Sequence, residues 1–312
     1  HNLGEVIDGI HMLMENPDCT MDELMTCVQG PDFPTGGILM GKSGIRAAYA
    51  TGKGKLTLRG QTHFEKVRGR QAIIVTEIPY MVNKARLVKS IADLAKDKRI
   101  EGISHIQDES SREGMRIVIE LKKDANEQIV LNKLFTYTQL QDTVSVNMLA
   151  LVGGEPKTLS LKQVLEEYLK FQVEVITNRS KFDLEKAKKR AHILQGFLLA
   201  IDYIDEVIAI LRDSKTVPEG KARLIERFKD VDMSALLDRA QYDMEGYQLE
   251  HKQGLTEEQA EAIVQMRLGQ LTGMERQKVT DELYVLIQKI TDLLDILANR
   301  ERVYQIIMDD LN

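Results

Sequence analysis

The residue pattern with the most specific chemical meaning lies near position 40. Residues 36–43 read Gly-Gly-Ile-Leu-Met-Gly-Lys-Ser and match G-x-x-x-x-G-K-[ST], the loop with which many nucleoside triphosphatases cradle phosphate. That chemistry requires a hydrophobic strand directly before the loop and a helix directly after it. Residues 31–35 contain two prolines and cannot form a central strand. Residues 38–40 resemble a strand themselves, and Gly44 is expected to interrupt any helix that follows. The context therefore argues against nucleotide hydrolysis.

Basic residues gather around the same loop. Between Gly36 and Arg70 the chain has eight Lys and Arg residues and a single acid, Glu65, whereas the whole chain has a formal net charge of −6. Glycine lets a backbone approach a phosphate closely, and Lys or Arg neutralises it. Such contacts position a duplex without reading its sequence. On composition alone, a solvated basic face explains this run better than a nucleic-acid interface does.

Residues suited to catalysis or metal binding are scattered. The six histidines lie apart from any serine or cysteine in a known nucleophile context. Solvation explains the acid pairs at 108–109 and 166–167. Cys19 and Cys27 have no His or Asp at metal-ligand spacing, so we expect reduced thiols, no zinc site and no disulfide. The residues by themselves predict no catalytic group and no metal. They indicate a DNA-binding or scaffold module and do not by themselves indicate an enzyme.

Composition limits the class of protein. The chain has 312 residues, of which 43% are apolar and 29% charged, which predicts a well-folded protein of two or more domains. It contains no run of about 18 apolar residues, so we expect no membrane span. It begins His1-Asn2-Leu3, without Met or a signal peptide, which reads like the middle of a longer cytoplasmic chain.

Capping signals organise the N-terminal residues. Asn2 and Thr20 each precede a Glu by three residues, a capping-box spacing that predicts two short helices, the first ending near Met14. Residues 30–37 contain two prolines and three glycines and cannot continue a helix. We therefore place a domain junction there.

Residues 37–157 mix strand and helix periods. Caps at Asn83 and Asn126 predict two helices, the second running to about Leu140. Strand-like runs lie before, between and after these two helices, at 56–59, 72–78, 115–121 and 144–151. Because strands and helices do not alternate regularly, the pattern predicts an α+β domain and not a doubly wound sheet.

Two long helical patterns follow Pro156. Residues 160–212, which begin with a Ser160 cap signal, contain no proline and a single glycine, Gly196, so they form either a coiled coil or a helix broken near that glycine. Residues 279–311 keep a heptad spacing in which Arg300 is the one a/d position that is not apolar.

The two patterns are expected to pair in antiparallel fashion, because the chain must go out and come back. A compact helical bundle is the alternative. Between them, roughly from 201 to 272, we expect a helical knob with a helix capped by Thr256. Thr272 supplies a capping signal for the returning helix. The polar residues 230–254 are expected to form a surface excursion.

Several segments together resemble the A subunits of bacterial type II topoisomerases, in particular those of DNA gyrase. They occur in family order across nearly the whole chain and are the residues 1–7, 30–35, 51–55, 77–80, 82–86, 99–103, 108–110, 114–120, 190–194, 266–268 and 271–273. The Glu-Gly-Ile segment at 101–103 and the Gly-Met-Arg-Ile-Val-Ile-Glu segment at 114–120 look more like gyrase than like its topoisomerase IV counterpart.

The resemblance implies a mixed α/β tower domain followed by a long antiparallel coiled coil with a helical dimerisation knob. The regions that it implies are the end of a winged-helix domain (1–35), the tower (36–157), the outgoing arm (158–205), the exit-gate knob (206–272) and the returning arm (273–312). The family's catalytic tyrosine lies upstream, in an Arg-Tyr-Thr context that no tyrosine here has. Tyr137, between two threonines, comes nearest.

The family implies a function that the residues alone do not. The chain would contribute to ATP-dependent passage of double-stranded DNA through a double-strand break. The gyrase B subunit would hold ATP and Mg²⁺, and this chain would hold no cofactor. We predict that the tower contacts phosphate through Lys42, Arg46, Lys53, Lys55 and Arg59, with Lys84 and Arg86 as weaker candidates. We predict a homodimer interface at the exit gate that includes Ile263, Met266, Arg267, Leu268 and Leu271. The alternatives are the equivalent chain of a topoisomerase IV and a non-catalytic coiled-coil scaffold.

Overall fold

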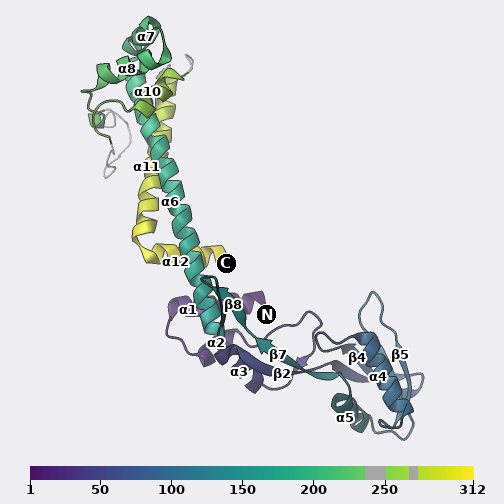
Figure 1. Ribbon diagram of the computed structural model, residues 1–312. Coiled ribbons are helices and arrows are strands. Elements are labelled where there is room, and N and C mark those ends of the chain that lie inside the picture. The colour runs from purple at the N-terminus through teal and green to yellow at the C-terminus, as the bar shows by residue number, and fades with distance from the viewer. Residues whose placement is uncertain (236–250, 267–272) are drawn as a thin grey trace. The chain divides into compact units, whose positions relative to one another are not determined.

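The computed structural model describes residues 1–235, 251–266 and 273–312 (Figure 1). They form two compact units, His1–Lys170 and Phe171–Asn312. The helices of the first unit are α1 (Leu3–Glu15), α2 (Met21–Cys27), α3 (Ser43–Thr51), α4 (Lys84–Lys96) and α5 (Glu127–Tyr137). Its strands are β1 (Ile38–Leu39), β2 (Lys53–Arg59), β3 (Gln61–Val67), β4 (Arg70–Glu77), β5 (Ile103–Asp108), β6 (Ile117–Leu121), β7 (Gln141–Asn147), β8 (Leu149–Val152) and β9 (Glu155–Thr158).

Helix α6 (Leu161–Asp202) begins in the first unit and ends in the second. The helices that follow it in the described residues are α7 (Ile204–Asp213), α8 (Val217–Phe228), α10 (Glu257–Val264), α11 (Gly273–Ala298) and α12 (Arg300–Leu311). This mixture of antiparallel sheets and helices agrees with the predicted α+β class. None of the described helices is long and apolar enough to cross a membrane.

The helix starts lie where the capping signals predicted them. The side chain of Asn2 accepts a hydrogen bond from the Glu5 N–H at 3.1 Å, and Thr20 forms a capping box with Glu23. Such caps satisfy N–H groups that lack a partner within the helix. The same bond forms at four further predicted caps, which are Asn83, Asn126, Ser160 and Thr256. The predicted cap at Thr272 lies outside the described residues.

A three-stranded antiparallel sheet, in the order β1–β2–β7, carries α3 on one face. Leu56 and Leu58 of β2 are buried on that face. The prediction that Gly44 interrupts the following helix is wrong, because α3 begins at Ser43 and contains it. A Cβ atom at Gly44 would lie 2.3 Å from the carbonyl oxygen of Lys55. The glycine therefore lets the helix backbone lie directly against β2.

A second antiparallel sheet, in the order β3–β4–β6–β5, packs against α4 and α5. Its buried core combines residues of both central strands and both helices, among them Ile73, Val75, Ile117, Ile119, Leu87, Ile91 and Leu134. The predicted strands at 72–78 and 115–121 correspond to these central strands. The sequence patterns missed β3 and β5, because edge strands exposed on one side carry few apolar residues.

The strand predicted at 144–151 is two strands. Met148 separates them, since it donates its N–H to the carbonyl of Gly52 and accepts a bond from the N–H of Leu159. At this residue the chain therefore stops pairing with β2 and continues into the β8–β9 hairpin. The residue pattern from 144 to 151 does not show where the pairing partner changes.

Helix α6 passes through Gly196 without a break, contrary to one of the two predicted alternatives. A Cβ atom at Gly196 would lie 2.9 Å from the Cβ of Gln259, so the glycine permits close contact with α10. The helix ends instead before Tyr203. Beyond it, α7, α8 and α10 enclose a core that includes Leu199, Val207, Leu224, Phe228 and Ile263.

Helices α6 and α11 pack side by side within the second unit. Their shared apolar cluster is made by Ala187, Ala191, Leu194 and Leu198 of α6 with Leu283, Ile287 and Ile290 of α11. Ion pairs join Asp202 to Arg276 at 2.8 Å and Arg190 to Glu282 at 2.7 Å, which shows that the helices run antiparallel.

The heptad pattern of 279–311 does not form one helix. It breaks at Asn299, whose side chain accepts a hydrogen bond from the Glu301 N–H and caps α12. The non-apolar a/d residue Arg300 follows the break and donates to the Tyr304 hydroxyl at 2.9 Å. A cap within the pattern overrides the heptad spacing, because it satisfies the first N–H groups of a new helix.

Candidate nucleic-acid interface

The face of the β1–β2–β7 sheet opposite α3 carries three of the predicted cations. Side chains of a strand alternate between its two faces. Lys53, Lys55 and Arg59 therefore share this face with Thr57. Lys53 and Lys55 are exposed, and neither side chain has a hydrogen-bond or ion-pair partner in the described part of the chain.

Strand β7 completes this face with uncharged polar residues. Residues directly opposite in an antiparallel pair point to the same side. The register places Asn147 opposite Lys53, Ser145 opposite Lys55, Thr143 opposite Thr57 and Gln141 opposite Arg59. We call this surface the open face and define it by Lys53, Lys55, Thr57, Arg59, Gln141, Thr143, Ser145 and Asn147. It contains no acidic residue.

The β7 half of the open face was missed by sequence reasoning. The strand was predicted from its apolar residues, Val144 and Val146, although polar residues alternate with them from 143 to 147. That alternation indicates one solvated face. Only the register shows that these polar side chains lie beside the cations of β2.

Arg59 has intramolecular partners, unlike the two lysines. Its Nε donates to Gln141 Oε1, and its guanidinium lies 4.5 Å from the centre of the Phe135 ring. A cation over an aromatic face gains electrostatic attraction. These contacts orient Arg59 and reduce its availability to a ligand.

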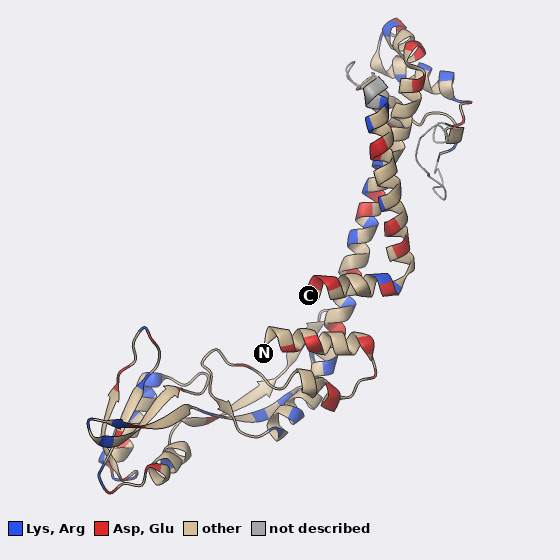
Figure 2. Ribbon diagram, turned by 180° about the vertical axis from the view of Figure 1, so that it is seen from behind, with Lys and Arg blue, Asp and Glu red and all other residues tan. Residues whose placement is uncertain are grey.

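Lys42 and Arg46 lie elsewhere, at the start of α3. Figure 2 shows the Lys and Arg residues of the described chain in blue and the Asp and Glu residues in red. Arg46 donates to Asp22 of α2 at 2.6 Å, while Lys42 has no side-chain partner in the described residues. Both line a hollow between α2 and α3, together with Asp22, Met25, Thr26, Gln29 and Ser43.

The structure does not give residues 36–43 the geometry of a phosphate-cradling loop. Ile38 and Leu39 form β1 and pair with Arg59 and Leu58 of β2. No strand precedes the motif in residues 28–37. The interior of the motif is held in a sheet and cannot wrap around a phosphate, although a helix does follow.

Lys84 and Arg86 belong to α4, which packs on the other sheet. Lys84 Nζ lies 2.7 Å from Asp108 Oδ2, and the Ser110 hydroxyl and N–H also donate to that carboxylate. The hydrogen bond from Lys84, followed by those from Ser110, lowers the pKa of Asp108 to about 2. Lys84 is thus engaged, whereas Arg86 is exposed and has no side-chain partner in the described part of the chain.

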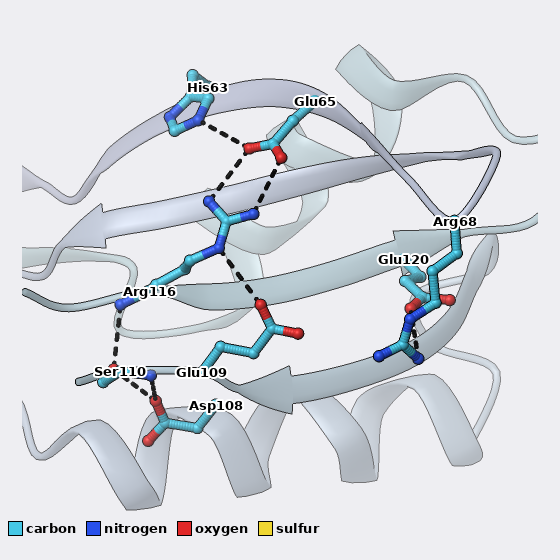
Figure 3. Close-up of polar contacts among 8 residues, drawn as sticks. All are labelled: His63, Glu65, Arg68, Asp108, Glu109, Ser110, Arg116 and Glu120. Atoms are coloured by element: carbon cyan, nitrogen blue, oxygen red, sulfur yellow. Dashed lines mark hydrogen bonds and ion pairs between the residues drawn. The ribbon is translucent and has the colours of Figure 1, made fainter.

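The helix-free face of the second sheet pairs its charges internally (Figure 3). Arg116 donates to both carboxylate oxygens of Glu65, at 3.1 and 3.0 Å, and to Glu109 at 3.3 Å. The hydrogen bond from Arg116 lowers the pKa of Glu65. Arg68 approaches Glu120 at 3.9 Å. This face is therefore close to neutral, in contrast to the open face.

Comparison with known proteins places these features in a family. The model of the DNA gyrase/topoisomerase IV A-subunit family matches residues 1–312. The chain belongs to this family. Its relatives include the DNA gyrase A subunit of Clostridium acetobutylicum, 54% identical over 313 residues, and that of Streptococcus pneumoniae, 49% identical over 313 residues. The DNA gyrase A subunit of Halalkalibacterium halodurans is 49% identical over 311 residues.

These alignments cover 100% of the chain and 34–35% of each relative. The chain thus spans about a third of the length of the gyrase A subunits that it matches. The resemblance seen in the short motifs is confirmed over every residue of the chain.

Within this gyrase/topoisomerase A chain, the described part of the predicted dimer interface lies in and beside the core that α7, α8 and α10 enclose. Ile263 is 2% exposed and packs in the cluster that contains Leu199 and Phe228, and Met266 packs against the same cluster. Arg267, Leu268 and Leu271 lie outside the described residues. The burial of Ile263 is explained within its own unit, and the dimer interface stays a prediction.

The described residues show few groups suited to bond-making chemistry. Tyr137, the tyrosine nearest to the family context, is 51% exposed, with the Arg99 guanidinium 5.8 Å from its ring centre. No group of three or more His, Cys, Asp or Glu side chains in the described ranges could hold a metal ion.

Proposed function

We propose that the chain is part of the DNA breakage–reunion subunit of a cytoplasmic DNA gyrase, which introduces negative supercoils by passing one duplex through another. Membership of the family over all 312 residues supports this proposal. In it, residues 36–157 act as the tower beside the gate DNA. The arms at 158–205 and 273–312 act as a coiled-coil strut that carries the exit-gate knob at 206–272, while residues 1–35 end the winged-helix domain.

The open face is the part of the chain that contacts gate-DNA phosphates in this proposal. The observation that carries it is the pair of exposed, unpartnered lysines, Lys53 and Lys55, on a face without acids. Lysines neutralise phosphates and release counterions, which makes binding depend on salt. Lys42 and Arg86 are also exposed, have no side-chain partner in the described residues, and can contact phosphate. Arg46, Arg59 and Lys84 already have partners and contribute less.

Salt dependence tests this assignment. Each phosphate that a lysine neutralises contributes about 0.9 to the slope of log K against log salt concentration. Replacing Lys53 and Lys55 by Ala is expected to reduce that slope by about 2. The matched control replaces two exposed lysines of α6, Lys181 and Lys189, and should leave the slope unchanged. An unchanged slope in the β2 variant refutes the assignment.

The exit-gate knob closes a two-fold dimer in this proposal. Its interface includes Ile263, Met266, Arg267, Leu268 and Leu271. Sedimentation of the chain at rising concentration is expected to show a dimer. A monomer at every concentration contradicts the interface.

ATP and Mg²⁺ belong to the partner B subunit in this proposal. Titration of ATP onto the chain should therefore show no saturable binding. Saturable binding would favour the rejected phosphate-loop interpretation of residues 36–43. We also expect the 312-residue polypeptide not to cleave DNA by itself, because none of its tyrosines has the Arg-Tyr-Thr context. Cleavage by it would refute the expectation that the nucleophile lies outside these residues.

A further inference from the structure

We propose that β7 supplies a second, uncharged row of DNA contacts, in which Thr143, Ser145 and Asn147 donate hydrogen bonds to phosphate oxygens of the duplex that Lys53 and Lys55 neutralise. This inference rests on the proposed function. It assigns uncharged binding residues. The DNA-contacting residues predicted from the sequence, in contrast, are all Lys or Arg.

The side chains of this row carry hydrogen-bond donors that have no partner in the described residues. Thr143, Ser145 and Asn147 are exposed, and each carries an O–H or N–H group. None of the three side chains forms a hydrogen bond with another residue in the ranges that the structure describes. Gln141, at the end of the row, differs because it already accepts from Arg59.

The two rows have the spacing needed to follow one phosphate backbone. Alternate residues of a strand lie about 6.6–6.8 Å apart, and neighbouring strands lie about 4.8 Å apart. Thr143 to Asn147 therefore spans about 13 Å. The rise of one DNA strand is about 3.4 Å per phosphate along the helix axis, and its wound backbone separates successive phosphates further, so this length faces a short run of phosphates. Lys55 and Ser145, directly opposite each other, can reach the same phosphate group.

The composition of the open face favours the duplex backbone as its ligand. Proteins that bind single strands stack unpaired bases on aromatic side chains. The residues that define the open face include no aromatic side chain, and the guanidinium of Arg59 lies over the one ring described beside it, that of Phe135. Hydroxyl, amide and ammonium groups instead suit phosphate oxygens and position a duplex without reading its sequence.

Loss of the neutral β7 donors and loss of the lysines are expected to change the salt dependence of DNA binding differently. An uncharged donor strengthens binding without displacing a counterion, so its loss lowers affinity equally at every salt concentration. The loss of a lysine lowers both affinity and the salt slope. The two rows can therefore be separated in one binding experiment.

The test replaces the donors with side chains that cannot form a hydrogen bond, in the variant Thr143→Val, Ser145→Ala, Asn147→Ala. Anisotropy of a short fluorescent duplex is measured between about 50 and 200 mM salt. We expect binding to weaken about tenfold at every salt concentration with an unchanged slope, the size expected for three neutral hydrogen bonds at the weak end of their range. Thr143→Ser keeps a hydroxyl and should bind like the parent. Gln128→Ala with Asn132→Ala, exposed on α5, should also have no effect.

The outcomes separate this inference from the proposed function. If the Lys53 and Lys55 variant loses slope but the β7 variant binds like the parent, the β7 row is refuted and the proposed function stands. If the lysine variant keeps its slope, the proposed function fails whatever the β7 variant does. A β7 variant that loses slope also contradicts the inference, because its contacts would then not be neutral. Circular dichroism melting of each variant verifies that the fold is retained.

Discussion

The ion pair between Lys84 and Asp108 allows a quantitative test of the structure. We consider the variant Asp108→Asn, which removes the charge but keeps an oxygen that can accept from Ser110. The parent carboxylate accepts from Lys84 at 2.7 Å and from the Ser110 N–H and hydroxyl at 3.0 and 2.5 Å. The substitution therefore weakens mainly the contact that joins α4 to β5.

The magnitude follows from the pKa of Asp108. A fall from the ordinary value of 3.8 to about 2 corresponds to about 2.4 kcal/mol of stability. The side chains of Asp108 and Lys84 are 35% and 34% exposed, so solvent screening reduces this to about 1 kcal/mol. Because the pKa is lower in the folded state, the contribution is complete above the unfolded pKa, near 4, and is lost as the pH falls toward 2.

Urea denaturation followed by circular dichroism measures the effect. The free energy of unfolding of the parent should exceed that of the Asp108→Asn variant by about 1 kcal/mol at pH 7 and by about zero near pH 2. Asp97→Asn, an exposed acid at the other end of α4, is the control and should show no such difference. Combining Asp108→Asn with Lys84→Met isolates the pair in a double-mutant cycle.

Two results would refute this reasoning. A stability difference that stays constant from pH 7 to pH 2 would mean that the charge of Asp108 does not stabilise the fold. A carboxyl carbon resonance of Asp108 that titrates at or above 4 would mean that Lys84 is free. In that case Lys84 would return as a candidate for phosphate contact.

Three further changes test the packing. Gly44→Ala should destabilise the first unit by about 1–3 kcal/mol and weaken DNA binding, because the added Cβ would lie 2.3 Å from the Lys55 carbonyl oxygen. A fully stable variant would show that α3 does not lie against β2. Leu283→Ala, at a 0% exposed site between α6 and α11, should cost about 2–5 kcal/mol in urea denaturation, whereas Val285→Ala, 64% exposed, should cost little. Asn299→Ala should raise hydrogen exchange at the start of α12 by an amount equivalent to about 1 kcal/mol, and unchanged exchange would mean that the cap does not stabilise α12.

Features that depend on neighbouring residues could be predicted from the sequence. A helix cap needs a polar side chain and an N–H group three residues on, so Asn2, Thr20 and Asn83 were predicted from local spacing alone. Buried central strands such as β4 were also predicted, because a fully buried strand requires a continuous apolar run.

Glycines show where local reasoning fails. Gly44 and Gly196 were interpreted as possible helix breaks, which is what glycine favours in isolation. Both lie inside helices, and both are close to a neighbouring element, Lys55 in one case and Gln259 in the other. Close packing between elements far apart in the sequence outweighs the intrinsic preference, and no local pattern records it.

The sequence by itself determined the family, the order of the helices and the presence of a basic segment between residues 36 and 70. Only the tertiary structure decided which of those cations are available. Lys53 and Lys55 have no side-chain partner in the described residues, whereas Arg59 is held by Gln141 and Lys84 by Asp108. The reason is physical: whether a cation is free depends on the acids and polar groups that the fold brings within a few ångströms. Strand register brings Gln141 to Arg59, and the packing of α4 on its sheet brings Asp108 to Lys84.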